Sequence, residues 1–256
     1  QLSLTEAGKT FLAAVTPALD RIAITSMQLL EHTEPTALRI SAPPTFTMRW
    51  LIPRISAFQK KRGGVEVKLT TSTAPVNFDD RIYDVAIRGS HQPIPGMLSV
   101  PFMTETIVPV CHPDLMENGQ LDYPKLLANQ TLISYDTEPM AWSEWLSMAS
   151  QPDLRVFHTL QFEQMYFALQ AAAEGLGVVL VPLFLVADEI IAGRMCAPFG
   201  LLGSRQRRYY ANASLSNHES PIIAGFCEWL LKEGQDTEQS IDQWSSAMGW
   251  TPYIPS

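Results

Sequence analysis

Short apolar strands alternate with amphipathic helical stretches along most of this chain. Residues 65–71, VEVKLTT, alternate apolar and polar side chains as a half-buried strand does, whereas residues 43–61 carry apolar side chains at helical spacing. Further strands are expected at residues 38–42, 84–88, 106–110, 133–136, 178–181 and 207–216, and further helices between residues 162 and 177 and from residue 221 onward. Such alternation predicts an α/β fold with mainly parallel sheets and helices on both faces.

The sheet is expected to be divided between two lobes. The strands are more numerous than a single core of this size would use, and the late strand at residues 207–216 can return to the first lobe. Chain crossings of this kind make a hinged cleft in which a small ligand can sit. We therefore expect an effector-binding domain at 35–256, with one lobe at 37–106 and 207–234, a second at 107–206, and an unassigned C-terminal tail at 235–256.

A long amphipathic helix is predicted ahead of these lobes, within residues 1–34. Ser3 or Thr5 can cap it, Ser3 together with Glu6 as a capping box, and Pro17 is expected to bend it. The apolar positions follow the a/d spacing of a coiled coil. They are Leu12, Val15, Leu19, Ile22 and Leu29. This stripe is either a dimerisation surface or the face that packs on the chain's own domain.

Composition excludes several classes of protein. With 46% hydrophobic and 17% charged residues, the 256-residue chain is not a disordered one. A net charge of −8 leaves no overall basic footprint for a nucleic-acid backbone. Three widely spaced cysteines with no C-x-x-C pair indicate reduced thiols in a cytoplasmic protein. No apolar run reaches the length of a transmembrane helix, so no membrane partner is expected.

The sequence offers little support for catalysis. The five histidines are scattered, with no H-x-x-x-H, H-E-x-x-H or G-x-S-x-G pattern, so neither metal nor triad chemistry is indicated. Gly175 and Gly177 follow a predicted helix and precede a strand, which is the reverse of a dinucleotide-binding turn. We therefore expect no enzyme activity, no cofactor and no metal.

Six stretches, taken in order, resemble LysR-type transcriptional regulators, especially the glycine-cleavage-activator-like branch. They are LSLTEAGKTFL at 2–12, LRISAPPTFTMRWLIPRISAFQKK at 38–61, DVAIRGSHQPIPGM at 84–97, TETIVPVCHPDL at 104–115, WSEWL at 142–146 and ALQAAAEGLGVVLVPLFLVADEIIAGRMCAPF at 168–199. The resemblance implies a two-lobed, periplasmic-binding-protein-like (type 2) effector domain behind a linker helix that pairs two subunits. It also implies a homodimer or homotetramer that binds DNA only through a winged helix-turn-helix domain preceding these residues.

The turn after the first predicted strand is a candidate ligand site. Thr45 is placed to cap the next helix, whose free N–H groups and positive dipole end suit a carboxylate. The resemblance implies an effector contact for Thr45 and Phe46, with Pro44 in the same turn. The alternative is that Thr45 only caps its helix.

Arg88 is a second candidate, because a guanidinium can form a bidentate pair with an acidic ligand or a salt bridge with a surface carboxylate. Gly89 follows it where this branch usually has an aromatic residue, which reshapes that side of the cleft. Further candidates lie at the crossover and at strand or helix ends: Ile107, Val108, Tyr135, Trp142, Thr159 and Phe162. Ile107 and Val108 are equally explained as plain hinge, and Trp142 as core.

These features together predict the regulatory, effector-binding portion of a DNA-binding transcription regulator. It would sense a small molecule, such as an amino acid or another carboxylate, in the cleft between the lobes. The alternative is the solute-binding protein of a transport system, which would need an export signal and has no use for a long a/d helix.

Overall fold

The computed structural model comprises two compact units, residues 1–37 and residues 38–256. It describes residues 5–30, 37–78, 82–116, 125–155, 157–202, 204–217 and 220–250. Helix α1 (Glu6–Leu30) makes up nearly all of the described part of the first unit. Thr5 caps it, since its Oγ1 accepts a hydrogen bond from the Gly8 N–H at 3.1 Å. Ser3, the other predicted cap, lies outside the described residues.

The predicted apolar stripe lies along α1, which also contains Pro17. Leu12, Leu19 and Ile22 are exposed, at 52%, 59% and 62% of their surface, and Val15 is half-buried. The side chain of Leu29 lies outside the described part of the structure. No other described element of the first unit covers these residues, so burying the stripe requires a second surface.

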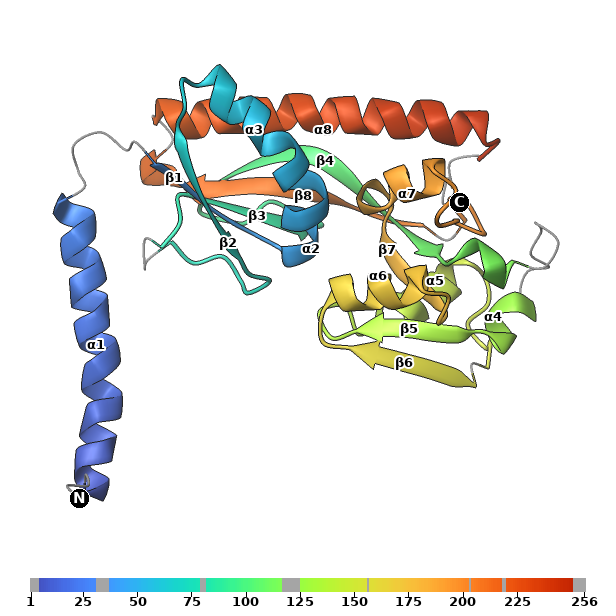
Figure 1. Ribbon diagram of the computed structural model, residues 1–256, viewed down its shortest axis with the longest axis horizontal. Helices are drawn as coiled ribbons and strands as arrows, with labels where there is room; N and C mark the ends of the chain where they lie inside the picture. Colours follow the sequence, from blue (N-terminus) through green and yellow to red (C-terminus); the bar gives the residue numbers. More distant parts are fainter. Residues whose placement is uncertain are drawn as a thin grey trace. The chain divides into compact units, whose positions relative to one another are not determined.

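The second unit is built on one eight-stranded sheet with the strand order β2-β1-β3-β8-β4-β7-β5-β6. The strands are β1 (Ala37–Ala42), β2 (Glu66–Thr71), β3 (Val85–Ser90), β4 (Met97–Val110), β5 (Thr131–Tyr135), β6 (His158–Phe162), β7 (Val178–Pro182) and β8 (Arg205–Ser214). Strands β1 to β3 lie at one end of the unit and β5 to β7 at the other, with β4 and β8 between them (Figure 1). The two ends are the two lobes of an α/β fold.

The sheet is mixed rather than mainly parallel. Parallel pairs join β1 to β3, β5 to β6 and β5 to β7. Strand β8 is antiparallel to both β3 and β4, and β4 is antiparallel to β7. The reason is that β4 carries the chain from one lobe to the other and β8 carries it back, so the two crossover strands must run in opposite directions.

Helices cover the sheet of each lobe. After β1, the segments α2 (Pro44–Phe46), η1 (Thr47–Leu51) and α3 (Ile52–Lys61) follow one another without a break. The wider π-type turn of η1 leads into Pro53, which lies in the first turn of α3, where its missing N–H is tolerated. The remaining segments are η2 (Pro113–Leu115), α4 (Lys125–Asn129), α5 (Ala141–Met148), α6 (Met165–Ala173), η4 (Leu183–Leu185), α7 (Ala187–Ile191), η5 (Leu215–Asn217) and α8 (Pro221–Ala247).

Three hydrophobic clusters form the core. The largest lies in the first lobe and contains an aromatic group, in which Phe46 stacks on Trp50 with ring centroids 5.1 Å apart and Phe58 meets Phe226 at 5.2 Å. The other two clusters belong to the second lobe, and they contain adjacent residues of β4, Val108 in one and Ile107 in the other. Because neighbouring residues of a strand point to opposite faces, both faces of that lobe's sheet are covered.

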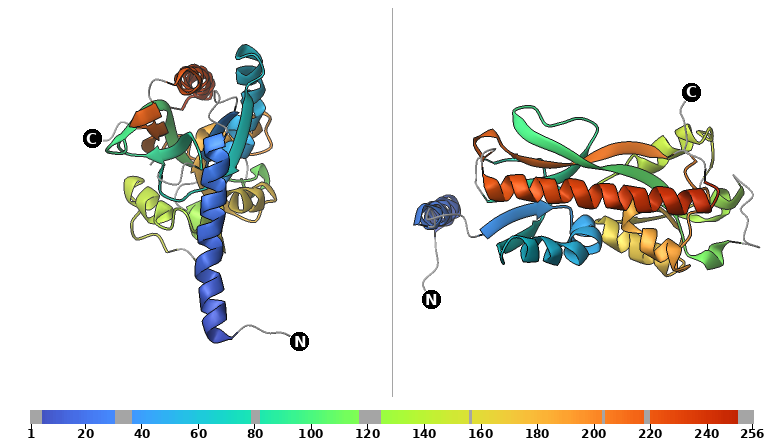
Figure 2. Two further views of the ribbon diagram at one scale, coloured as in Figure 1. Left: turned by 90° about the vertical axis from the view of Figure 1, so that its left-hand side faces the viewer. Right: turned by 90° about the horizontal axis from the view of Figure 1, so that it is seen from above.

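Helix α8 extends beyond the boundary expected from the sequence, since residues 235–247 of the predicted tail are its C-terminal half. Its N-terminal half packs in the first lobe through Phe226 and Leu230. Its C-terminal half reaches the second lobe, where Ile241 and Trp244 pack on a core cluster and the Trp244 and Trp250 rings lie 4.8 Å apart. Figure 2 shows this single helix running over both ends of the sheet. No described helix is long and apolar enough to cross a membrane.

Candidate functional site

The turn after β1 differs from the prediction. Pro43 occupies the cap position of α2 in an extended conformation, with no side-chain capping bond, and Pro44 follows as the first helical residue. Thr45 is therefore inside the helix, with 4% of its surface exposed, and the prediction that it caps the helix is wrong. The physical reason is that proline, which lacks an N–H, is well suited to the first helical position, so the helix begins at Pro44, two residues earlier than a Thr45 cap would allow.

Phe46 lies in the core of the first lobe. Its ring stacks on Tyr209 of β8 at a centroid distance of 5.0 Å and meets the edges of Phe102 and Phe184 at 6.2 Å. The ring is fully buried. Phe46 therefore packs on one face of the Tyr209 ring and holds α2 against the crossover strands.

Arg88 is bound by backbone rather than by an acid. Its Nε donates to the Ala74 carbonyl, its Nη1 to the carbonyls of Ser41 and Ile87, and its Nη2 to the Ser41 hydroxyl, at 2.8–3.1 Å. Among the described residues no carboxylate forms an ion pair with it. Burial lowers the pKa of Arg88 from its ordinary value. Four of its five donors are used, so Arg88 joins β1 and β3 to the loop between β2 and β3.

A cluster of charges lies where the crossover strands meet the second lobe. Glu105 on β4 faces Arg207 on β8 in the strand register, and the Arg207 Nε donates to Glu105 Oε2 while its Nη2 lies 3.3 Å from Oε1. The same Nη2 donates to Glu138, in the loop after β5, at 2.5 Å. Tyr209 is next on the same face of β8. We call Glu105, Glu138, Arg207 and Tyr209 the junction cluster.

Burial makes the electrostatics of this cluster strong. Glu105 has no exposed surface. Burial by itself would lower the pKa of Arg207, but the carboxylates of Glu105 and Glu138 outweigh it and the pKa is raised. The pKa of Tyr209 is also raised, by burial first and then by the charge of Glu105. Arg207 is therefore a cation and Tyr209 a neutral phenol, whose O–H can donate a hydrogen bond.

Gly89 explains how the cluster fits against β3. A Cβ at this position would lie 3.0 Å from Glu105 Oε2, 3.1 Å from the Tyr209 ring and 3.2 Å from Arg207 Nε. These distances are tighter than nearly all normal Cβ contacts, so a side chain here would displace the buried ion pair. The lack of a side chain at Gly89 thus makes room for Glu105 and Arg207.

The predicted residues of the second lobe are dispersed. The Tyr135 hydroxyl donates to the Leu180 carbonyl at 2.9 Å, although its ring is close enough to Tyr209 to affect the pKa of that phenol. The Trp142 indole donates to the Ile133 carbonyl at 2.8 Å. The other four occupy separate environments. Thr159 is exposed on edge strand β6, Phe162 packs partly on the core, and Ile107 and Val108 are buried in β4.

The structure therefore brings Phe46, Gly89 and Tyr135 around the junction cluster and leaves the other predicted contacts apart from it. Sequence reasoning missed the charged members of the cluster. One signal was present: Glu105 stands alone among the apolar residues of FMTETIVPV, and acids are almost never fully buried unless they are paired. Its partner, Arg207, is distant in sequence and could not be assigned from spacing.

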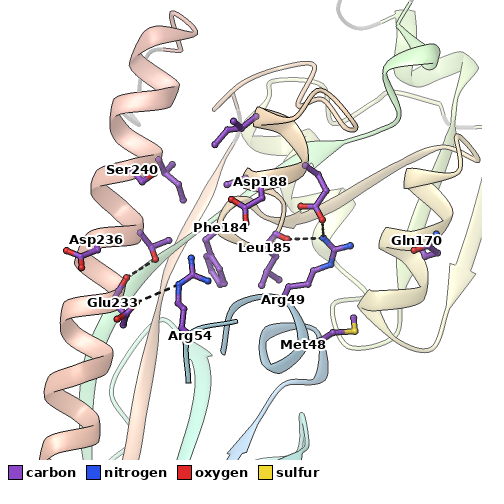
Figure 3. A pocket seen from close by; sticks show the side chains of 15 residues that line it. Met48, Arg49, Arg54, Gln170, Phe184, Leu185, Asp188, Glu233, Asp236 and Ser240 are labelled. Atoms are coloured by element: carbon purple, nitrogen blue, oxygen red, sulfur yellow. Dashed lines mark hydrogen bonds and ion pairs between the residues drawn. The ribbon is translucent and has the colours of Figure 1, made fainter. Parts of the chain in front are cut away.

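A pocket of about 500 Å³ lies between η1, α7 and α8 (Figure 3). Arg49 extends into it and pairs with Glu189 of the second lobe at 2.6 Å, while Arg54 lies 3.8 Å from Glu233 of α8. None of the predicted site residues lines this pocket. It is a second place where a charged pair joins the lobes. Among the described residues, no group of three or more His, Cys, Asp or Glu side chains is placed to hold a metal ion.

The sequence of this chain matches that of a known protein family. The family model described as "LysR substrate binding domain" matches residues 32–235. The chain is 28% identical to the "Glycine cleavage system transcriptional activator" of Escherichia coli K12, over 94% of this chain and 79% of that protein. It is 29% identical to the "HTH-type transcriptional regulator TrpI" of Pseudomonas aeruginosa, over 91% of this chain and 79% of that protein.

Solved structures agree in fold. The effector domain of the transcriptional regulator AmpR of Pseudomonas aeruginosa superposes with a TM-score of 0.68 at 24% identity, covering 80% of this chain and 98% of that one. The LysR-type regulator CrgA of Neisseria meningitidis gives 0.68 at 19% identity, covering 91% and 81%. At these identities the likeness concerns the fold alone.

Proposed function

The chain belongs to the LysR substrate-binding domain family, and on that basis we propose that it senses a small amino-acid-like effector at the junction cluster. Its two-lobed sheet is the periplasmic-binding-protein-like type 2 fold of effector domains in LysR-type regulators. It is the regulatory, effector-binding region of such a regulator, a family of transcription factors rather than enzymes. A solute-binding role in transport is not favoured.

The contact between Glu138 and Arg207 carries the proposal. Glu138 comes from the second lobe and Arg207 from crossover strand β8, so this 2.5 Å bond fastens the second lobe to the strand that returns to the first. A ligand carboxylate that replaces Glu138 on Arg207 breaks this bond and forms another of the same kind. Ligand binding at the cluster is therefore coupled to the relation between the lobes, as a sensor requires.

The charge of the cluster favours a zwitterion over a simple anion. Two carboxylates, Glu105 and Glu138, surround one guanidinium, so the group carries a net charge of −1 before a ligand arrives. A simple carboxylate would add a second uncompensated negative charge in a buried place, which is costly. An α-amino acid brings an ammonium group that can pair with the displaced carboxylate of Glu138.

We propose that the effector acts on DNA binding through the assembly of subunits. The apolar stripe of α1, with Leu12, Val15, Leu19, Ile22 and Leu29, would pair two copies into a homodimer that can further associate into a homotetramer. The protein would act in the cytoplasm and bind DNA through the N-terminal domain typical of the family. An effector that binds two arrangements of the lobes unequally would shift the balance between two ways of gripping DNA.

A thermal-shift panel of matched ligands tests the proposed effector class. Each α-amino acid is paired with the carboxylate that lacks its ammonium group, such as alanine with propionate and phenylalanine with 3-phenylpropionate. A ligand of the folded state raises the melting temperature, and the amino acid of a binding pair should raise it more. If no panel member shifts the melting temperature at millimolar concentration, an amino-acid effector is ruled out.

Two variants with the same change of charge then locate the site. Glu138→Gln should strengthen binding of the simple carboxylate by about tenfold, equivalent to about 1.4 kcal/mol, because the ligand no longer competes with a carboxylate for Arg207. The amino acid should gain less, because it loses the partner of its ammonium group. Glu189→Gln removes the corresponding carboxylate from the pocket beside α8 and should change neither affinity. If Glu189→Gln changed the affinities and Glu138→Gln did not, the ligand would bind in that pocket instead.

A further inference from the structure

Two cysteines far apart in sequence lie side by side in the second lobe. Cys111 follows the end of β4 and Cys196 lies in the segment after α7, and the two form an isolated antiparallel bridge. Each backbone N–H donates to the other residue's carbonyl, at 3.0 and 2.9 Å. Their Sγ atoms are 3.5 Å apart, in van der Waals contact, and both thiols are free.

This backbone arrangement fits a disulfide. Residues that exchange both hydrogen bonds in an antiparallel pair have Cα atoms about 5.5 Å apart, which lies in the middle of the range found in disulfides. The sulfur atoms already touch, so the bond requires rotation of side chains and little movement of the chain. The third cysteine, Cys227, is in α8 and belongs to the core of the first lobe.

We propose that Cys111 and Cys196 form a reversible dithiol–disulfide pair that responds to a peroxide. The Cys196 thiol releases its proton, and the thiolate attacks one oxygen of hydrogen peroxide. The O–O bond breaks, a sulfenic acid forms, and the departing hydroxide takes up the released proton and leaves as water. The Cys111 sulfur then attacks the Cys196 sulfur, its proton leaves with the hydroxyl as a second water, and the S–S bond forms. The two thiols lose two electrons and two protons, and the peroxide is reduced to two waters.

The environments of the two thiols assign these roles. Cys196 is partly exposed, whereas Cys111 has no exposed surface, so peroxide reaches Cys196 first. The hydrogen bond between the thiols raises the pKa of Cys111, and burial raises it further. The same hydrogen bond lowers the pKa of Cys196. The reactive thiol is the one with the greater thiolate character and access, and the buried thiol beside it resolves the sulfenic acid.

A soft metal ion is the competing use of this pair, since Met116 Sδ also lies 2.8 Å from Cys196 Sγ. A metal would require both thiols as thiolates, and the remaining contacts of Cys111 are with an apolar cluster that includes Leu127 and Trp145. A disulfide is neutral and adds no charge to that cluster. Desolvation therefore favours the disulfide.

The position of the pair gives the bond a consequence. Cys111 is the residue directly after crossover strand β4, and Cys196 precedes crossover strand β8 by nine residues. A disulfide ties the end of β4 to the segment that leads back to β8, within the second lobe. Oxidation should therefore stiffen that lobe, independently of any ligand at the junction cluster.

Mass spectrometry of the complete chain tests the proposal. The reduced protein is treated with hydrogen peroxide, unfolded and alkylated, and then digested without reduction. Before oxidation all three thiols should take the alkylating reagent. After oxidation only Cys227 should take it, the chain should lose two hydrogen atoms, and one cross-linked peptide should join Cys111 to Cys196. The melting temperature should rise on oxidation and return with dithiothreitol.

Variants separate the two steps. Cys227→Ser should oxidise like the wild type. Cys111→Ser should stop at the Cys196 sulfenic acid, which dimedone traps, whereas Cys196→Ser should give almost no dimedone adduct because Cys111 is buried. Three alkylated thiols after peroxide, a cross-link that involves Cys227, or a cross-link between two chains would overturn the proposal. So would a stably held Cu(I) or Hg(II) ion, one per chain, that protects both thiols from peroxide.

Discussion

Helix α8 contains two glycines whose replacement by alanine should have opposite effects on stability. At Gly234 a Cβ would lie 1.9 Å from the backbone oxygen of Phe102 on β4, so the helix touches the crossover strand directly there. At Gly225 a Cβ would lie 1.9 Å from Nη2 of Arg62, the free end of a long side chain that is 39% exposed. A backbone oxygen in a sheet cannot move away, whereas a partly exposed guanidinium can.

The expected magnitudes follow from two opposing terms. Alanine in a helix interior is more stable than glycine by about 0.8–1.0 kcal/mol, and this gain applies equally at both positions. Overpacking against a rigid neighbour costs about 1–3 kcal/mol or more. Gly234→Ala should therefore destabilise the chain by about 1–2 kcal/mol after the gain is counted, and Gly225→Ala should stabilise it by up to about 1 kcal/mol. The separation between the variants is about 1–3 kcal/mol.

Urea denaturation, monitored by circular dichroism, measures this separation. The dependence of the unfolding free energy on urea concentration must be the same in both variants and the wild type, as two-state unfolding requires. In a thermal scan a separation of this size corresponds to about 2–12 °C for a domain of 150–250 residues. Equal stability of the two variants would refute the reasoning, because it would mean that α8 is not seated on the backbone of β4. A destabilised Gly225→Ala would show that Arg62 is held more firmly than its exposure indicates.

Three further predictions concern the charges, the thiol and the apolar stripe. Arg207→Ala removes the cation between two carboxylates and should cost about 3–5 kcal/mol in urea denaturation, while Arg208→Ala, an exposed neighbour, should change stability by less than about 0.5 kcal/mol. Burial, with a smaller effect of a nearby carboxylate, raises the pKa of Cys227 to about 11 from an ordinary 9.0, so its contribution is complete below pH 9 and is lost as the pH rises to 11. In urea denaturation under a reductant, the free energy of unfolding should fall between pH 8 and pH 10.5 by about 2 kcal/mol more in the wild type than in Cys227→Ala. Leu19→Asp should lower the oligomer mass in light scattering while Ala14→Asp, on the outer face of α1, leaves it unchanged, and equal masses for both would remove the stripe from the interface.

The regular elements could be predicted because their patterns are local. The alternation at residues 65–71 and the helical spacing at residues 43–61 depend only on near neighbours, and both elements are present as β2 and as the run from α2 to α3. The direction of the crossover strands could not be predicted this way, because pairing between β4 and β8 joins residues about one hundred positions apart. The C-terminal half of α8 was missed for a similar reason. Its helical pattern is weakened by polar residues, and it depends on packing against the second lobe.

The candidate site shows the same division between local and distant information. Thr45 was assigned from local capping preference, and the neighbouring prolines changed the outcome. Arg88 was assigned as a partner for an acidic ligand or a surface carboxylate, but in the structure it donates to three carbonyl groups and the Ser41 hydroxyl, which no local pattern reveals. Glu105 and Arg207 become a pair only when two crossover strands lie in register. The chemistry of the junction cluster therefore depends on the topology of the sheet.

The two sides of the sheet restrain the lobes differently, and this limits how an effector can act. On one side the bond from Glu138 to Arg207 holds the second lobe to β8, and a charged ligand can exchange this bond at little net cost because one charged contact replaces another. On the other side α8 packs on both lobes, with Ile241 touching the core cluster of each, and no ligand contact compensates for its loss. A ligand at the junction cluster should therefore change the angle between the lobes about α8 as a fixed edge, rather than separate them. Truncating Trp244 to alanine loosens that edge, so it should weaken the dependence of lobe orientation on ligand without weakening ligand binding itself. Small-angle scattering with and without ligand measures the first effect, and the ligand-induced shift in melting temperature measures the second.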